Sequence, residues 1–123
     1  MNRVLLVEDN GHNSRLIDQL LMDMDIGIEL SISATGKGAI QLANDNDFDL
    51  VIMDVSLPDM NGIDVTKEIK RNMKYNEVPF IVATAHAMSN EEALFKETFD
   101  DYISKPIDDD VFTEKINKWL GVK

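Results

Sequence analysis

The chain contains no cysteine, few basic residues and no long apolar run. Without cysteine it cannot form disulfide bonds, thiol nucleophiles or cysteine zinc sites, which agrees with a reducing compartment. The longest apolar stretches are far shorter than a membrane-spanning helix, and no basic segment followed by an apolar one opens the chain. We therefore expect a soluble, cytoplasmic protein that is not exported and does not enter a membrane.

Basic residues are scarce relative to acidic ones. Lysine and arginine number 12, against 23 aspartates and glutamates, which gives a formal net charge of −11. Such a charge repels the phosphate backbone of nucleic acids and the anionic surface of a membrane. We therefore expect no direct binding to nucleic acid or to a membrane, and we expect partners that are proteins.

With 123 residues the chain fits one domain, which can bury a core without disulfide or metal support. Short apolar runs alternate with segments of helical apolar spacing, such as Ile17, Leu20, Leu21 and Met24. This alternation is typical of an α/β fold, a doubly wound parallel sheet with helices on both faces. The expected strands cover about 4–7, 28–33, 50–54, 80–84 and 102–104, and the expected helices about 13–24, 37–44, 62–72, a segment from 89 and a segment after 108. We expect five strands and five helices in one domain over residues 1–123, with no output domain.

Two polar segments predict where the last two helices begin. Ser89-Asn90-Glu91-Glu92 has the form of a capping box, in which the serine and the second glutamate satisfy each other's backbone N–H groups. Asp108 precedes the last helical pattern and is placed to cap it. Both segments therefore support the expected helix count.

Polar side chains follow four of the apolar runs. The runs end on Glu8 and Asp9, on Asp54, on Thr84 and on Lys105. The carboxyl ends of parallel strands meet at one edge of a sheet, where open α/β folds keep their active sites. The sequence therefore predicts one site with three carboxylates, a hydroxyl and an ammonium group.

Clustered carboxylates repel each other unless a cation joins them. Oxygen ligands without histidine or cysteine favour a hard ion, and carboxylates with water and phosphate are the usual ligands of Mg²⁺. Lys105 and Thr84 would add a positive charge and a hydroxyl donor, as a site for a phosphoryl group requires. No serine, cysteine or histidine is placed as a nucleophile, so Asp54 is the expected phosphoryl acceptor.

The same segments resemble a known family over essentially the whole chain. The matching stretches are Val7-Glu8-Asp9-Asn10 with Asn13, Met53-Asp54, Leu57-Pro58-Asp59-Met60-Asn61-Gly62, Ala83-Thr84-Ala85 and Asp101-Tyr102-Ile103-Ser104-Lys105-Pro106-Ile107. In this order and at strand ends, they resemble the receiver domains of two-component response regulators. The resemblance implies a flavodoxin-like sheet with strand order 2-1-3-4-5.

The resemblance also implies roles for individual residues. Asp54 would be the phosphorylated residue. Asp9 would bind Mg²⁺ directly and Glu8 through water, and the backbone carbonyl of Ser56 would be a further metal ligand. Lys105 would pair with the phosphoryl group, and the Lys105-Pro106 peptide would be cis.

Four further roles follow from the resemblance. Thr84 and Tyr102 would form a switch pair, in which the hydroxyl moves to the phosphoryl oxygen and the aromatic ring turns inward. Ser56 and His86 would flank the phosphoryl group and affect water access. Glu8 departs from the family pattern, in which aspartate is commoner.

The partners implied are a histidine kinase or a histidine phosphotransfer protein as donor and a downstream protein as effector. The donor is expected to dock near Asn10, His12 and Arg15. The effector is expected to contact a surface with Ala87, Met88, Glu91, Tyr102 and Pro106-Ile107. Such a protein receives and slowly releases its own phosphoryl group, so it is not expected to be a turnover enzyme on an external substrate.

Three alternatives remain open. The chain could be a receiver cut from a hybrid kinase, although its start at Met1 and its end after Trp119-Leu120 favour a stand-alone protein. An aspartate-nucleophile hydrolase of haloacid-dehalogenase type would need a second aspartate where Ser56 stands. A flavodoxin-like electron carrier would need hydrogen-bond donors for the flavin phosphate in place of Glu8 and Asp9.

Overall fold

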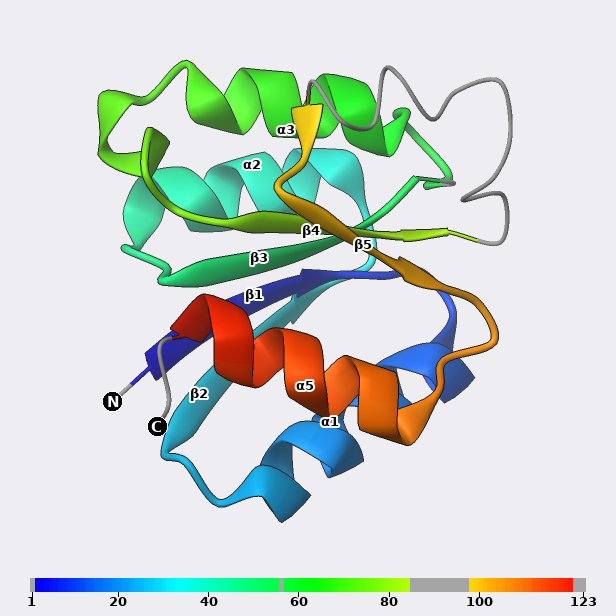
Figure 1. Ribbon diagram of the computed structural model, residues 1–123. Helices are drawn as coiled ribbons and strands as arrows, with labels where there is room; N and C mark the ends of the chain where they lie inside the picture. Colours follow the sequence, from blue (N-terminus) through cyan, green and yellow to red (C-terminus); the bar gives the residue numbers. More distant parts are fainter. Residues whose placement is uncertain (1, 56, 85–97, 121–123) are drawn as a thin grey trace.

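The computed structural model describes residues 2–55, 57–84 and 98–120, and Figure 1 shows their arrangement. Five parallel strands form one sheet in the order β2-β1-β3-β4-β5. Their bounds are β1 Asn2–Val7, β2 Ile28–Ser33, β3 Leu50–Asp54, β4 Phe80–Thr84 and β5 Asp101–Ser104. The expected doubly wound α/β fold and its strand order are confirmed.

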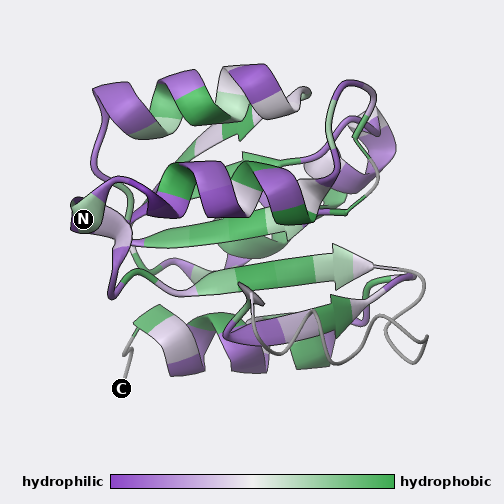
Figure 2. Cartoon of the chain, turned by 90° about the horizontal axis from the view of Figure 1, so that it is seen from above, coloured by the Kyte–Doolittle hydropathy of each residue, from purple (hydrophilic) through white to green (hydrophobic). Residues whose placement is uncertain are grey.

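Helices cover both faces of this sheet (Figure 1). The helices α1 Gly11–Met24 and α5 Asp109–Leu120 lie on one face, and α2 Gly36–Asp45 and α3 Gly62–Lys70 lie on the other. Every residue of β3 is buried, and its side chains alternate between the two cores: Val51 and Met53 pack towards α2 and α3, while Leu50 and Ile52 pack towards α1 and α5. Figure 2 shows the same layering, with hydrophobic strands between helices that alternate hydrophobic and polar residues. The sheet is therefore packed between two apolar layers.

The described residues contain four α-helices and one short 3₁₀ helix, η1 Met73–Tyr75, which the apolar spacing did not predict. The helix expected from Ser89 falls outside the described residues. Asp108 caps α5 as expected, because its carboxylate accepts hydrogen bonds from the backbone N–H groups of Asp110 and Val111. In the part of the chain described, no helix is long and apolar enough to cross a membrane.

Helix α1 begins at Gly11, two residues before the expected start. The side chain of Asn10 accepts hydrogen bonds from the backbone N–H groups of His12 and Asn13, at 2.9 and 3.1 Å. Asn10 is therefore the N-cap, and the first turn, Gly11 to Ser14, has no large apolar side chain. Apolar spacing does not detect such a turn.

Two side chains of the loop after β3 bond to the first residues of helices. The carboxylate of Asp59 accepts hydrogen bonds from the N–H groups of Gly36 and Lys37 at the start of α2, at 2.7 and 3.1 Å. The side chain of Asn61 caps α3 by accepting a hydrogen bond from the N–H group of Ile63 at 2.8 Å. The N–H of Gly62 also donates to the carbonyl oxygen of Val55 at 2.9 Å, so the residue after β3 is bonded to the start of α3.

Gly62 lies against the backbone at the end of β3. A Cβ atom at this position would be 2.2 Å from the carbonyl oxygen of Asp54 and 2.9 Å from the Cα atom of Val55. Backbone atoms cannot move aside as a flexible side chain can, so Gly62→Ala should lower the free energy of unfolding by about 2–3 kcal/mol. Urea denaturation monitored by circular dichroism would measure this change.

Gly11→Ala is the matched control, since Gly11 is also the first residue of a helix and a Cβ there would have nothing within 4 Å. We expect this variant to be as stable as the wild type or slightly more stable, because alanine favours the helix over glycine. Equal stability losses in the two variants would contradict the close contact at Gly62.

Candidate functional site

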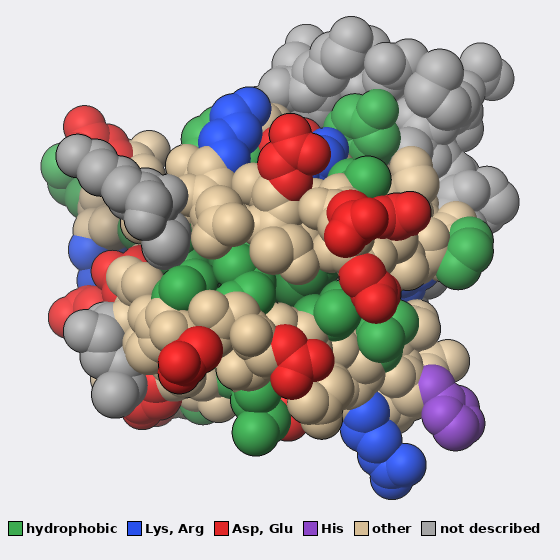
Figure 3. All heavy atoms as spheres, turned by 60° about the horizontal axis from the view of Figure 1, so that its bottom comes forward, with side chains coloured by type: hydrophobic (Ala, Val, Ile, Leu, Met, Phe, Trp, Pro, Cys, Tyr) green, Lys and Arg blue, Asp and Glu red, His purple; other side chains and the backbone are tan. Residues whose placement is uncertain are grey.

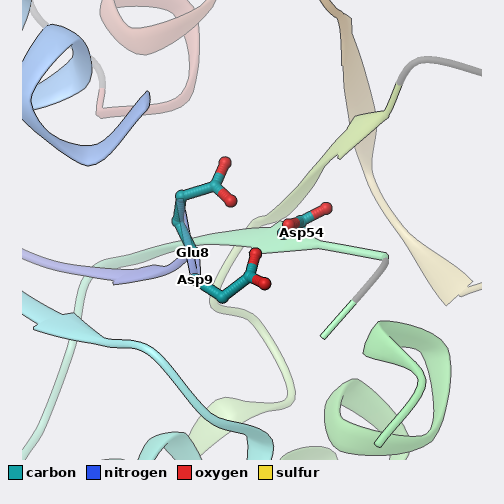
Figure 4. A group of neighbouring side chains, drawn as sticks. All are labelled: Glu8, Asp9 and Asp54. Carbon is teal, nitrogen blue, oxygen red and sulfur yellow. The ribbon is translucent and has the colours of Figure 1, made fainter. Parts of the chain in front are cut away.

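The strand register brings the predicted site residues to one edge of the sheet. Val7 pairs with Met53, so the next residues, Glu8 and Asp54, follow at neighbouring positions. Asp54 pairs in turn with Ala83. Figure 4 shows the carboxylates of Glu8 and Asp9 at the end of β1, next to that of Asp54 at the end of β3. The parallel register alone therefore places these three residues together.

The three carboxylates form a compact group. One oxygen atom from each of Glu8, Asp9 and Asp54 lies within 4.8 Å of the others. Glu8 and Asp54 are 2 and 5% exposed, whereas Asp9 is exposed to solvent. The group therefore has two buried carboxylates, Glu8 and Asp54, and one accessible carboxylate, Asp9, which an ion from solvent can reach.

Lys105 contributes the positive charge of the group. Its Nζ lies 3.0 Å from Oε1 of Glu8 and 3.3 Å from Oδ1 of Asp54. Its backbone N–H donates to the carbonyl oxygen of Thr84 at 2.9 Å, which continues the pairing of Thr84 with Ser104. The ammonium group therefore lies between the carboxylates of two different strands.

Burial and pairing act in opposite directions on these groups. Burial raises the pKa of Glu8, but hydrogen bonds with Asp54 and Lys105, and the charge of Lys105, outweigh burial and hold that pKa below its ordinary value. Burial lowers the pKa of Lys105, but its hydrogen bond to Glu8 and the charges of Asp54 and Glu8 raise it overall. Near neutral pH, Glu8 is therefore a carboxylate and Lys105 an ammonium ion.

The donor set of this site fits a hard divalent cation. Three carboxylates against one ammonium group leave an excess of negative charge, and all the acidic ligands are oxygen atoms. Mg²⁺ prefers such ligands and keeps several waters, which the exposed side of Asp9 permits. The residues present therefore fit Mg²⁺, with Asp9 at the accessible rim and Glu8 held by Lys105.

The other predicted site residues lie on β4, on β5 and just after β5, or fall outside the described residues. Thr84 is buried at the end of β4, and Tyr102 is 43% exposed on β5. The Lys105-Pro106 peptide bond is cis, the geometry that the resemblance implies. Ser56 and His86 fall outside the described residues.

Two sets of hydrogen bonds could not be predicted from the sequence. The backbone N–H of Asn10 donates to Oε2 of Glu8 at 3.3 Å, so the N-cap of α1 also orients a site carboxylate. Asp101 at the start of β5 is bonded to Lys115 and Trp119 of α5. Pairs of this kind depend on the packing of α5 against β5, which apolar spacing does not specify.

A comparison with protein families identifies the family of this chain. Residues 4–117 match the model of the response regulator receiver domain. The chain belongs to this family. This membership sets aside the hydrolase and electron-carrier alternatives. Receiver domains belong to two-component systems, in which they are phosphoacceptors that interact with histidine kinases and effectors.

Relatives of this receiver domain occur in two settings. It is 37% identical to the sensor protein GacS of Pseudomonas syringae pv. syringae over 98% of its own length, but it spans only 14% of that sensor. It is 36% identical to the polar-differentiation response regulator DivK of Brucella ovis, covering 96% of this chain and 95% of DivK. Receiver domains similar to this one therefore form part of a long sensor protein or nearly all of a short regulator.

A solved receiver domain has the same fold and holds a metal ion. The receiver domain of a sensor histidine kinase from Pseudomonas aeruginosa PAO1 superimposes with a TM-score of 0.88 and 29% identity, and 98% of each chain is covered. That structure has a magnesium ion coordinated in its active site cleft. In the present receiver domain, the acidic group of Glu8, Asp9 and Asp54 could hold a metal ion.

Proposed function

We propose that this receiver domain takes a phosphoryl group onto Asp54 from a phosphohistidine protein, in a reaction that requires Mg²⁺. The observation that carries this proposal is the buried carboxylate of Asp54, 3.3 Å from the ammonium group of Lys105 and close to two further carboxylates. An aspartate at the end of a buried strand, with a fixed cation beside it, can accept a phosphoryl group without a second nucleophile. The donor would be a histidine kinase or a histidine phosphotransfer protein.

In the transfer, a carboxylate oxygen of Asp54 forms a bond to phosphorus. The bond between phosphorus and the imidazole nitrogen of the donor breaks, and its electron pair returns to that nitrogen. Lys105 would move from the carboxylates towards the phosphoryl oxygens and neutralise part of their charge. Mg²⁺, held by Glu8, Asp9, Asp54 and the carbonyl of Ser56, would supply the remaining positive charge.

The phosphorylated domain would act by changing a protein-binding surface. Thr84 would bond to the phosphoryl group and Tyr102 would turn inward, and a downstream protein would recognise the altered surface around β5 and α5. The face in Figure 3 carries acidic side chains spread among separate lysines and arginines, which supports a protein effector over nucleic acid. The domain would release its phosphoryl group slowly and would not turn over an external substrate.

A small phosphodonor tests the proposal without the unknown kinase. Incubation with acetyl phosphate and Mg²⁺ should add one phosphoryl group per chain, measured by intact-mass spectrometry. Chelation of the metal should prevent the gain, because the phosphoryl oxygens would then meet three carboxylates and a single ammonium group. A wild-type protein that gains no phosphoryl group, or gains it equally without Mg²⁺, would contradict the proposal.

Mg²⁺ binding should depend more on Asp9 than on Glu8, because Asp9 would bind the ion directly and Glu8 through water. Asp9→Ala should lower the affinity for Mg²⁺ on the order of 100-fold. Glu8→Ala should lower it by about tenfold, because Glu8 would contact the ion only through a water molecule. Isothermal titration calorimetry would measure both, with exposed Glu77→Ala as the control for charge. Equal affinity in wild type and Asp9→Ala would refute the assignment of Asp9.

Thr84→Ala should separate phosphorylation from switching. The variant keeps Asp54 and Lys105, so it should still bind beryllofluoride, a stable mimic of the phosphoryl group. It lacks the hydroxyl that would couple this group to Tyr102, so the amide shifts that the mimic causes around Tyr102 and Met88 should disappear from the NMR spectrum. Thr113→Ala on α5 is the control, and wild-type shifts in Thr84→Ala would refute the coupling.

A further inference from the structure

Lys115 of α5 contacts both the ring and the backbone of Tyr102. Its Nζ lies 4.4 Å from the centroid of the Tyr102 ring and donates a hydrogen bond to the carbonyl oxygen of Tyr102. The same atom lies 2.8 Å from Oδ1 of Asp101. An ammonium group at this distance from an aromatic ring is attracted to its face. Lys115 therefore stabilises Tyr102 where it lies, with 43% of the residue exposed.

Asp101 holds the ammonium group of Lys115 in place. Its Oδ2 accepts a hydrogen bond from the indole N–H of Trp119 at 2.8 Å, and its Oδ1 accepts one from the backbone N–H of Tyr102 at 2.8 Å. Burial raises the pKa of Asp101, but the bonds from Lys115, Trp119 and the Tyr102 amide outweigh burial and lower it. Asp101 is therefore a fixed anion between β5 and α5.

We infer that Lys115 is a positioning residue that holds Tyr102 in its exposed position and so favours the resting state of the receiver domain. The inference rests on the proposed function, in which Tyr102 turns inward on phosphorylation. It goes beyond the pair of Thr84 and Tyr102, because the restraint comes from α5 and not from the phosphorylation site.

Only one of the contacts of Lys115 depends on where the Tyr102 ring points. The bonds to Asp101 and to the Tyr102 carbonyl involve atoms that stay in place when the side chain rotates, whereas the ring contact is lost. A cation over an aromatic face at a partly exposed site changes such an equilibrium about two- to fivefold. Removal of the ammonium group should therefore raise the ratio of inward to exposed Tyr102 by that factor.

A ligand that selects the inward state binds more tightly when that state is more populated. Lys115→Met keeps much of the aliphatic stem but removes the cation, so it should bind beryllofluoride in saturating Mg²⁺ two- to fivefold more tightly than the wild type. Loss of a positive charge by itself would weaken the binding of this anionic mimic, so tighter binding has the opposite sign to the simple charge effect. NMR titration of the amides around the site would measure the affinity.

Lys118→Met is the matched control. Lys118 lies on the same helix with its Nζ 4.9 Å from the Trp119 ring, so the variant removes an identical charge and an aromatic contact. We expect no gain in mimic affinity for Lys118→Met, and wild-type affinity for Lys115→Arg, because a guanidinium group can also stack on Tyr102 and pair with Asp101. Equal affinities in Lys115→Met and Lys118→Met would overturn the inference.

A second measurement tests Lys115 without any mimic. The three-bond couplings from the Tyr102 ring carbon to the backbone nitrogen and carbonyl report its side-chain rotamer in the unphosphorylated protein. They should indicate one dominant rotamer in the wild type and more averaging in Lys115→Met and in Asp101→Asn, which loosens Lys115. The couplings of buried Tyr75 serve as the internal reference.

The two measurements separate two kinds of failure. Unchanged Tyr102 couplings in both variants would overturn the role of Lys115, even if the wild type binds beryllofluoride as proposed. A wild type that binds no mimic would contradict the proposed function, and the couplings alone would then decide whether Lys115 restrains Tyr102. Amide shifts along α5 show whether the helix is intact in each variant.

Discussion

Asp54→Asn is expected to abolish phosphoryl uptake from acetyl phosphate. The amide keeps the shape of the side chain, but it lacks the anionic oxygen that would form the bond to phosphorus. Glu8 also contacts Lys105 and lies beside two carboxylates, but it is bonded to the backbone N–H of Asn10 as well, and the family resemblance assigns the acceptor role to Asp54. Intact-mass spectrometry should show no gain in this variant under conditions that label the wild type.

Asp59→Asn is the matched control for this experiment. Asp59 belongs to the same loop after β3, but its carboxylate is exposed and bonded to the start of α2. This variant should be labelled like the wild type, because its amide oxygen can still cap the helix. If Asp54→Asn were labelled as well as the wild type, the assignment of the acceptor would be wrong.

Lys105→Met is expected to change two properties in opposite directions. Without the ammonium group, Glu8 and Asp54 lose their internal cation, so the site becomes more negative and should bind Mg²⁺ on the order of tenfold more tightly. The phosphoryl group would lose the charge that neutralises its oxygens, so uptake from acetyl phosphate should become slower on the order of tenfold or more. No change in overall stability produces this pair of effects.

Calorimetry for Mg²⁺ and the time course of mass gain would measure the two effects of Lys105→Met. Lys67→Met, an exposed lysine on α3, controls for the change in net charge and should alter neither. A Lys105→Met protein with weaker Mg²⁺ binding would show that the lysine does not compete with the metal. Wild-type uptake would show that it does not assist transfer.

The sheet and the carboxylate group could be predicted because both depend on local features of the sequence. Each buried strand is a short apolar run, and the residue that ends the run is the residue at the carboxyl edge. Glu8, Asp9 and Asp54 therefore meet once the strands are parallel and neighbouring. The strand order came from the family resemblance, because apolar runs do not specify which strands are adjacent.

The finer contacts could not be predicted because they join distant parts of the chain. Lys105 was expected beside Asp54, but its shorter contact is with Glu8, 97 residues away, which depends on side-chain rotamers in a packed site. Lys115 and Trp119 meet Asp101 only because α5 packs on β5 in one particular orientation. The periodicity of apolar residues in the sequence does not specify the orientation in which a helix packs on a strand.

The most direct test of phosphoryl transfer to Asp54 is to identify the residue that carries the phosphoryl group. Borohydride reduces an acyl phosphate to an alcohol, so the chain phosphorylated by acetyl phosphate and Mg²⁺ should yield homoserine at position 54 when its peptides are sequenced by tandem mass spectrometry. Homoserine at position 54 alone is the predicted result. Reduction at another carboxylate such as Asp9, or a phosphoryl group that resists borohydride and lies on a hydroxyl such as that of Thr84, would contradict the account.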